Sequence, residues 1–84
     1  MAITYILKSL KDGKLYVGST EDLENRLNVH NGGKVRSTKG RRPFILVYKE
    51  EFNTVTEARK RELFLKSGQG RKFLKEILEG WPSG

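Results

Sequence analysis

Residues 3–18 read ITYILKSLKDGKLYVG and predict a β-hairpin. Residues 3–7 are rich in β-branched and aromatic side chains, which favour a strand, and residues 15–18 predict the strand that returns. Between them, Asp12-Gly13 suits the positive φ angles of a tight hairpin turn. Gly18 weakens the second strand, so we expect a bulge there, or another group packed closely against the backbone.

The segment after the hairpin predicts a helix over about residues 21–31. Ser19 or Thr20 offers an N-cap, and Gly32-Gly33 supplies the left-handed exit that often ends a helix. After a loop, residues 44–48 form an almost unbroken apolar run. Such a run predicts a strand covered on both faces, and we expect it to be the best-buried strand.

Two further helices complete the predicted fold. Thr54 and Glu57 form a capping-box pattern, so the second helix is predicted to begin there and to run to about Ser67. Glycines at positions 68 and 70 interrupt it, and residues 71–79 predict the last helix. The order β-β-α-β-α-α predicts an α+β fold, in which helices flank a small antiparallel three-stranded sheet. We expect one domain over residues 1–80 and a C-terminal tail over residues 81–84.

The composition excludes several classes of protein. The chain has 84 residues with no cysteine and one histidine, which excludes thiol chemistry and a structural zinc cage. No apolar run approaches the roughly 18 residues of a membrane span, and the N-terminus does not resemble a signal peptide. We therefore expect a cytoplasmic protein with no membrane partner.

Positive charge is concentrated in one loop. The chain carries 17 Lys and Arg against 10 Asp and Glu, a net charge of +7. Five of the cations lie between residues 32 and 42, where there is no acidic residue: Lys34, Arg36, Lys39, Arg41 and Arg42. Clustered cations attract polyanions, so this loop is predicted to bind the backbone of a nucleic acid. The alternative is a solvated loop whose charge is incidental.

A carboxylate intrudes into the apolar stripe of the second helix. Helical spacing places Glu62 among Val55, Ala58 and Leu65, the residues expected to face inward. An unpaired buried carboxylate is costly, so Glu62 should face a cleft, a cation or a basic partner. A simple ion pair with Lys66 or Arg59 on a partly exposed face is the alternative.

Four more polar side chains are expected near the same side of the sheet. Tyr5 and Tyr16 lie on opposite strands of the hairpin, and Arg26 and His30 are four residues apart on the first helix. Each alone has a structural explanation, in sheet packing, in a stem lying along the core or in the helix dipole. Together with Glu62 they suit phosphodiester cleavage, in which a carboxylate holds a metal ion, cations neutralise charge and a phenol or imidazole moves a proton.

The spacing of these residues resembles the GIY-YIG nuclease superfamily. Ile3-Thr4-Tyr5 and Tyr16-Val17-Gly18 stand where the family has its two name-giving triplets, although Ile3 and Thr4 replace the usual Gly and Ile. The likeness covers about residues 3–66. It is strongest to the short single-domain members related to the N-terminal nuclease domain of the excision-repair subunit UvrC.

The resemblance implies a role for each of these residues. Tyr5 would act as general base or orient the attacking water, with Tyr16 beside it. Arg26 would bind the scissile phosphate, and His30 would assist proton transfer or contact the phosphate.

It also implies a single metal ion and a close approach to the backbone. Glu62 would hold one Mg²⁺ or Mn²⁺, and Gly18 would let the DNA or a catalytic side chain approach its strand. Many members carry an asparagine after the glutamate, but here none follows Asn53, and Lys66, Ser67 or Gln69 would have to take that role.

The expected function is therefore hydrolysis of DNA phosphodiester bonds, in repair or recombination. The basic loop and Lys66 would bind the DNA, which is expected to be branched or bound without sequence preference, and a partner protein would supply specificity. The alternatives are a non-catalytic nucleic-acid-binding module on the same scaffold and, less favoured, a helix-turn-helix unit formed by the last two helices.

Overall fold

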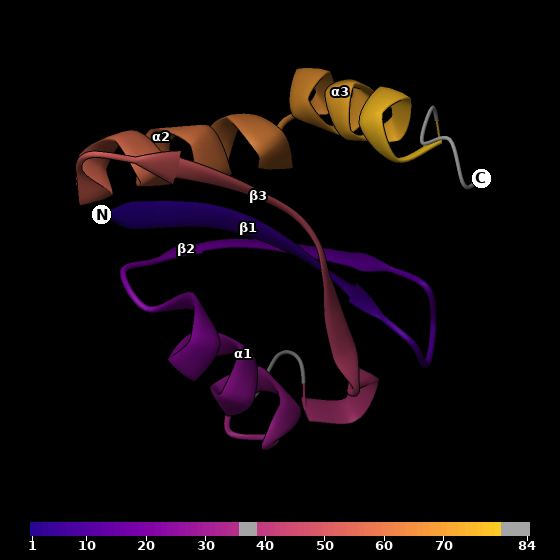
Figure 1. Cartoon of the computed structure of the whole chain (residues 1–84). Helices are drawn as coiled ribbons and strands as arrows, with labels where there is room; N and C mark the ends of the chain where they lie inside the picture. Colours follow the sequence, from indigo (N-terminus) through magenta and orange to yellow (C-terminus); the bar gives the residue numbers. More distant parts are fainter. Residues whose placement is uncertain (36–38, 80–84) are drawn as a thin grey trace.

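Three antiparallel strands form one sheet, and helices lie on both of its faces. The computed structural model describes residues 1–35 and 39–79, so Arg36 and the predicted tail over residues 81–84 lie outside the described residues. The strands are β1 (Ala2–Ser9), β2 (Leu15–Thr20) and β3 (Phe44–Phe52). The helices are α1 (Leu23–Asn31), a short 3-10 helix (Lys39–Arg41), α2 (Val55–Lys66) and α3 (Gly68–Glu79). The predicted α+β class and element order are confirmed, and Figure 1 shows α1 on one face with α2 and α3 on the other.

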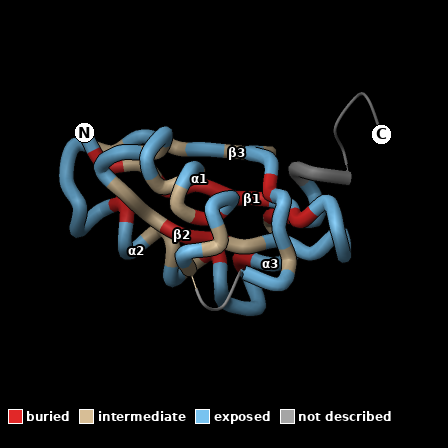
Figure 2. Tube along the Cα trace, turned by 90° about the horizontal axis from the view of Figure 1, so that it is seen from below, coloured by how far each residue is buried: buried red, intermediate tan, exposed pale blue. Residues whose placement is uncertain are grey.

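The central strand is β1, because the sheet order is β2-β1-β3. The prediction that residues 44–48 form the best-buried strand was therefore wrong. Ile6 and Leu7 of β1 are inaccessible, whereas Ile45 and Leu46 of the edge strand β3 are 43% and 36% exposed. Figure 2 shows the same contrast along the two strands. An apolar run indicates a strand, but the number of its neighbours depends on long-range pairing.

Alternating side chains of β1 feed two separate cores. Ile6 packs with Val17, Leu65 and Leu74 on the face covered by α2 and α3. Tyr5 and Leu7 face the other way, where they form a second cluster with Phe44 and the apolar side of α1. The period of two along a strand places Tyr5 on the α1 face and its neighbours Thr4 and Ile6 on the α2 face.

The starts of α1 and α3 differ from those predicted, whereas their last residues agree with the prediction. Asp22, rather than Ser19 or Thr20, caps α1, because its side chain accepts a hydrogen bond from the backbone N–H of Asn25 at 3.1 Å. The second helix ends at Lys66 with Ser67 as its C-cap, as predicted, but Gly68 and Gly70 lie in the first turn of α3 instead of before it. A Cβ atom on Gly70 would lie 2.7 Å from the carbonyl carbon of Leu65, so this glycine allows close contact between the two helices.

The beginning of α2 follows its sequence signal. The Thr54 side chain accepts a hydrogen bond from the Glu57 N–H at 3.2 Å, as expected of an N-cap. Ala58 and Leu65 are buried as predicted. Val55 is 49% exposed, so the prediction that it belongs to the inward stripe was wrong; the contact of the first turn with β1 is made by Ala58, whose C=O accepts a hydrogen bond from Thr4.

Candidate active site

Tyr5, Tyr16 and His30 form a tight group between the sheet and α1. Tyr5 is only 1% exposed, and its hydroxyl oxygen lies 3.3 Å from Nε2 of His30. The ring of Tyr16 meets the His30 ring edge-on, with 4.8 Å between the ring centroids. His30 is fully buried in the last turn of α1, and the Phe44 ring also lies beside it. This packing holds both phenols and the imidazole in fixed orientations.

The glycine in β2 makes room for Tyr5. Gly18 is the residue directly opposite Tyr5 in the strand register. A Cβ atom built on Gly18 would lie 2.6 Å from Cζ of the tyrosine ring. Any side chain at this position would therefore displace the phenol. The group that approaches the backbone at Gly18 is thus the side chain of Tyr5.

Arg26 places a positive charge against the two phenols. Its guanidinium group interacts with Tyr5, and this hydrogen bond is the main reason why the pKa of Arg26 is raised, with Tyr16 adding to the effect. Burial raises the pKa of Tyr5, and the hydrogen bond with Arg26 only partly opposes this. At neutral pH the site therefore holds a fixed cation beside a protonated phenol.

His30 is neutral under the same conditions. Burial lowers its pKa below the usual 6.5, and the nearby positive charge of Arg26 lowers it further. A neutral imidazole has one nitrogen that donates and one that accepts, so His30 can take up a proton from Tyr5 in the tautomer whose Nε2 is unprotonated.

Glu62 lies in a partly buried position on the opposite face of the sheet, so the prediction that it shares one side with the two tyrosines was wrong. The reason is that α1 and α2 cover different faces of the sheet. Its side chain is 14% exposed. The Ser19 hydroxyl donates a hydrogen bond to Oε1 at 2.6 Å, and Lys66 Nζ lies 2.6 Å from Oε2. Burial raises the pKa of Glu62, but the hydrogen bonds from Lys66 and Ser19 outweigh it, so the pKa lies below its ordinary value. Glu62 is therefore a carboxylate with both oxygens engaged.

The tyrosine-histidine group on the α1 face and the Glu62 carboxylate on the α2 face meet at the outer edge of β2. The paired positions Tyr5 and Gly18 point toward α1, whereas Ser19, the next residue of β2, points toward α2 and Glu62. The negative charge of Glu62 contributes to the raised pKa of Tyr5, so the two faces are electrostatically coupled. Because β2 is an edge strand, no further strand separates the two halves.

The cations of the basic loop differ in their surroundings. Lys34, Lys39 and Arg42 are exposed, and the Arg42 side chain lies over Gly33. Arg41 is held by the hairpin turn, because its Nε lies 3.0 Å from Oδ2 of Asp12. Three cations of the described loop are thus available to a polyanion.

The donor atoms at Glu62 fit a magnesium ion bound together with substrate. Within residues 1–35 and 39–79, no group of three or more His, Cys, Asp or Glu side chains could form a metal cage. Mg²⁺ does not need such a cage, because it commonly binds one or two carboxylates and completes its shell with waters and phosphate oxygens. The carboxylate oxygens of Glu62 suit this mode, provided that Lys66 moves away from Oε2.

Two polar residues near the site were not predicted from the sequence to take part in it. Ser19 orients Glu62, and its signal was its place in β2, two residues after the core residue Val17 and on the same face. The Asn31 amide pairs with the backbone of Phe44, accepting from its N–H at 2.6 Å and donating to its C=O at 3.1 Å. This contact fixes the end of α1, and hence His30, to the start of β3.

A small α+β domain with an arginine, two tyrosines and a carboxylate around one strand edge is an arrangement that can bind and polarise a phosphodiester. The sequence profile of the GIY-YIG catalytic domain matches residues 1–75. The chain belongs to the GIY-YIG family, a nuclease family whose members act on DNA and generally use divalent metal ions.

Short relatives resemble the chain over nearly its whole length. A UPF0213 protein from Staphylococcus saprophyticus is 49% identical over 77 residues, which are 90% of this chain and 93% of that protein. Another, from Staphylococcus haemolyticus, is 45% identical over 76 residues, which are 89% and 92% of the two chains. The solution NMR structure of a UPF0213 protein from Bacillus halodurans matches with a TM-score of 0.56 and 36% identity, over 99% of this chain and 90% of that one.

None of the helices in the described part of the chain has the length and apolar character that crossing a bilayer requires.

Proposed function

We propose that the protein is a divalent-metal-dependent endonuclease that hydrolyses DNA phosphodiester bonds, acting in the cytoplasm in DNA repair or recombination. The observation that carries the proposal is the position of Arg26. Its guanidinium group lies beside Tyr5 and Tyr16, at the strand edge whose other side presents the Glu62 carboxylate. A fixed cation there can bind a scissile phosphate and stabilise the charge that develops on it.

Tyr5 orients the attacking water and relays its proton. Because burial raises its pKa, Tyr5 starts the reaction protonated. Its hydroxyl oxygen accepts the proton of the water while the hydroxyl proton passes to Nε2 of His30, which is 3.3 Å away. Tyr16 is only partly buried and lies against His30, so it borders the relay on the side of the solvent.

Glu62 is the residue that would hold the Mg²⁺ or Mn²⁺ ion, with Ser19 orienting its carboxylate. When bound, the ion supplies Lewis-acid stabilisation of the negative charge on the phosphate. Lys66 leaves Oε2 in that state and becomes available to a neighbouring phosphate. The exchange is accessible from solvent, because the Lys66 side chain is 47% exposed.

The basic loop supplies affinity without sequence preference. Lys34, Lys39 and Arg42 are exposed, and Arg36 adds a further cation to the same segment. Contacts of this kind neutralise phosphates, so the affinity for DNA should fall steeply as salt rises. Selection of the target, which we propose is branched DNA or a site bound without sequence preference, rests on DNA structure or on a partner protein.

One observation favours a second candidate, a non-catalytic module that binds nucleic acid. The short contact between Lys66 and Glu62 neutralises the carboxylate that the metal would need. In this alternative, Lys66 remains a structural partner, and the basic loop accounts for the whole function.

Plasmid nicking separates the two candidates. Supercoiled plasmid and branched oligonucleotides would be incubated with the wild type, Glu62→Gln and Arg26→Gln, with Mg²⁺, with Mn²⁺ and without metal. The control is Glu57→Gln, which removes an exposed carboxylate from the same helix. We expect metal-dependent nicking by the wild type and the control, and a loss of about 100-fold or more in the other two variants. Equal nicking by the wild type and Glu62→Gln would refute the proposed site, and unchanged binding without any nicking would favour the second candidate.

A further inference from the structure

A cavity of about 550 Å³ lies next to the proposed active site, between α3 and the outer strand β2. Its apolar surface comes from Leu15 and Val17 of β2, Leu65 of α2 and Leu74 of α3. Leu15 is 36% exposed at the rim, whereas the other three residues are buried. The cavity is therefore an opening that leads from solvent onto the core of the α2 face.

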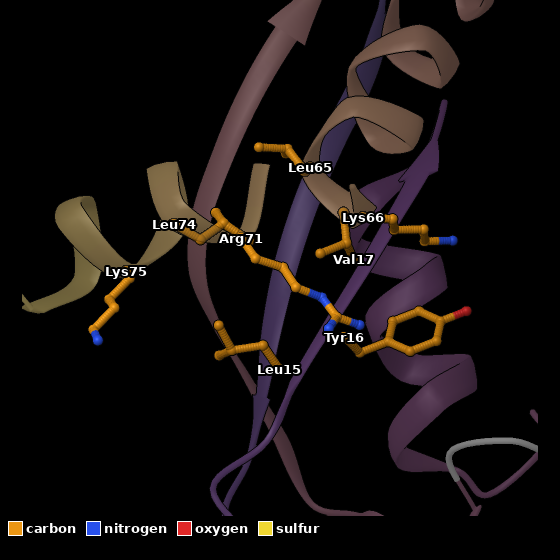
Figure 3. A pocket seen from close by; sticks show the side chains of 8 residues that line it. All are labelled: Leu15, Tyr16, Val17, Leu65, Lys66, Arg71, Leu74 and Lys75. Atoms are coloured by element: carbon orange, nitrogen blue, oxygen red, sulfur yellow. The ribbon is translucent and has the colours of Figure 1, made fainter. Parts of the chain in front are cut away.

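The charged side chains that line the cavity are positive among residues 1–35 and 39–76. Lys66, Arg71 and Lys75 contribute to its wall, and no acidic residue of those ranges does. Figure 3 shows Arg71 extending from α3 toward β2, with Lys66 and Lys75 on opposite sides of it. Lys66 is paired with Glu62, whereas Arg71 and Lys75 form no ion pair with residues 1–35 or 39–76. An apolar floor ringed by cations suits a ligand that has a flat apolar part and a negative charge.

The cavity is continuous with the proposed active site through two shared residues. Tyr16 lines the cavity, and its ring also contacts His30. Lys66 lines it as well, and the same ammonium group contacts the Glu62 carboxylate. A ligand in the cavity would thus lie beside a phosphate placed at the edge of β2.

We propose that this cavity is a nucleotide subsite that binds the base and the phosphate of a nucleotide flanking the cleaved bond. The inference rests on the proposed nuclease function and specifies how the substrate is held. The base packs on Leu15, Val17 and Leu74, and Arg71 and Lys75 bind its phosphate. The volume of the cavity, about 550 Å³, lies within the range of about 300–1,000 Å³ that is usual for pockets of small organic ligands.

Occupation of the subsite requires an unpaired base. A base within a duplex is stacked on both sides and paired along its edge, so it cannot enter a side cavity unless it is extruded. Contacts to the face of a base are tolerant of sequence, because every base has a π-face. The subsite thus favours DNA with an unpaired nucleotide next to the cleaved bond over a continuous duplex.

Charge-matched variants test the phosphate contact. Arg71→Gln/Lys75→Gln removes two cations from the cavity, and Lys60→Gln/Lys72→Gln removes two exposed cations of α2 and α3 that do not line it. The probe is thymidine 5′-monophosphate, with inorganic phosphate as the reference, and the readout is the methyl NMR spectrum. We expect the nucleotide to shift the Val17 and Leu74 methyl signals in the wild type and in the control pair. Its affinity should fall about tenfold in the cavity pair alone.

Leu15→Trp tests the base contact without changing any charge. The indole would fill the mouth of the cavity from a position that is already exposed, so the fold should tolerate it. This variant should lose affinity for the nucleotide but keep that for inorganic phosphate. It should also reduce binding of a single-stranded oligonucleotide more than binding of a hairpin duplex.

The results distinguish failure of the subsite from failure of the nuclease. Unmoved methyl signals, or equal shifts with inorganic phosphate, would overturn the nucleotide subsite, even if plasmid nicking persisted. Equal loss of affinity in the two charge pairs would also overturn it, because the effect would then reflect net charge. Nucleotide binding with the expected variant pattern supports the subsite even where plasmid nicking is absent, since the binding assay needs no catalysis.

Discussion

Replacing Gly18 with alanine tests whether Tyr5 must lie against the backbone of β2. The added Cβ would lie 2.6 Å from the ring carbon Cζ, well inside the contact distance of two carbon atoms. Tyr5 cannot retreat freely, because it is 1% exposed and its hydroxyl group meets His30. The ring has to tilt, and the tilt moves the hydroxyl away from Nε2.

The cost has two parts that can be sized from the structure. Overpacking a buried site costs about 1–3 kcal/mol, and the lost hydrogen bond between Tyr5 and His30 adds about 0.5–1.5 kcal/mol. The free energy of unfolding should therefore fall by roughly 2–4 kcal/mol. For a domain of this size, such a loss lowers the melting temperature by about 10 °C or more.

Thermal unfolding followed by circular dichroism measures the effect, with Gly40→Ala as the matched control. A Cβ on Gly40 would meet nothing within 4 Å, so this control should shift the midpoint little. In a Tyr5→Leu background the Gly18→Ala cost should shrink, because the clashing ring is gone. Equal midpoints for Gly18→Ala and Gly40→Ala, or an undiminished cost in the Tyr5→Leu background, would refute the reasoning.

Three further predictions concern the surroundings of the site. Because the pKa of buried His30 is depressed, the unfolded chain binds more protons as the pH falls below 6.5, so stability should be lost on acidification. His30→Gln should show a smaller drop in melting temperature between pH 7.5 and 5.5, and an unchanged drop would count against a buried neutral imidazole. Asn31→Ala leaves the N–H and C=O of Phe44 without their partners and should cost about 1–3 kcal/mol in urea unfolding; a loss under about 0.5 kcal/mol would contradict this role. Thr54→Ala should cost about 1 kcal/mol by the same measurement, whereas the neighbouring Thr56→Ala should cost less, and equal losses would argue against the cap.

Elements with local signals could be predicted from the sequence, whereas the sheet order could not. The hairpin turn around Gly13 and the cap at Thr54 are set by residues close in the chain, and both occur where predicted. Within the turn, however, Gly13 alone has a positive φ angle, and the positive φ predicted for Asp12 was wrong. The exposure of Ile45 depends on β1 lying between the other two strands, which is a pairing between distant segments. The start of α3 was misplaced because glycine disfavours helix, and the close contact of Gly70 with Leu65 overrides that preference.

The grouping of the site residues was predicted more fully than their surroundings. Helical and strand spacing, together with the family likeness, placed Tyr5, Tyr16, Arg26, His30 and Glu62 on one side of the sheet. The first four lie together as predicted, whereas Glu62 lies on the α2 face. Spacing does not give burial depth, so the inaccessible position of His30 emerges only from the packed structure. Ser19 was interpreted as a cap because it precedes a helix, but the register of β2 turns its hydroxyl toward α2.

The two interpretations of Glu62, as an ion-pair partner and as a proposed metal ligand, are compatible because its two oxygens are held differently. Oε1 is fixed by the Ser19 hydroxyl, which belongs to a strand of the sheet, whereas Oε2 faces a lysine whose side chain is 47% exposed. The hydrogen bonds from Lys66 and Ser19 together outweigh the burial of the carboxylate, because the pKa of Glu62 lies below its ordinary value. Lys66 thus stabilises the charged form of Glu62 while no metal ion is bound, and its exposed ammonium group can be exchanged for another cation. A carboxylate oriented by the sheet and covered by an exchangeable cation is what a site that binds a metal ion together with its substrate requires.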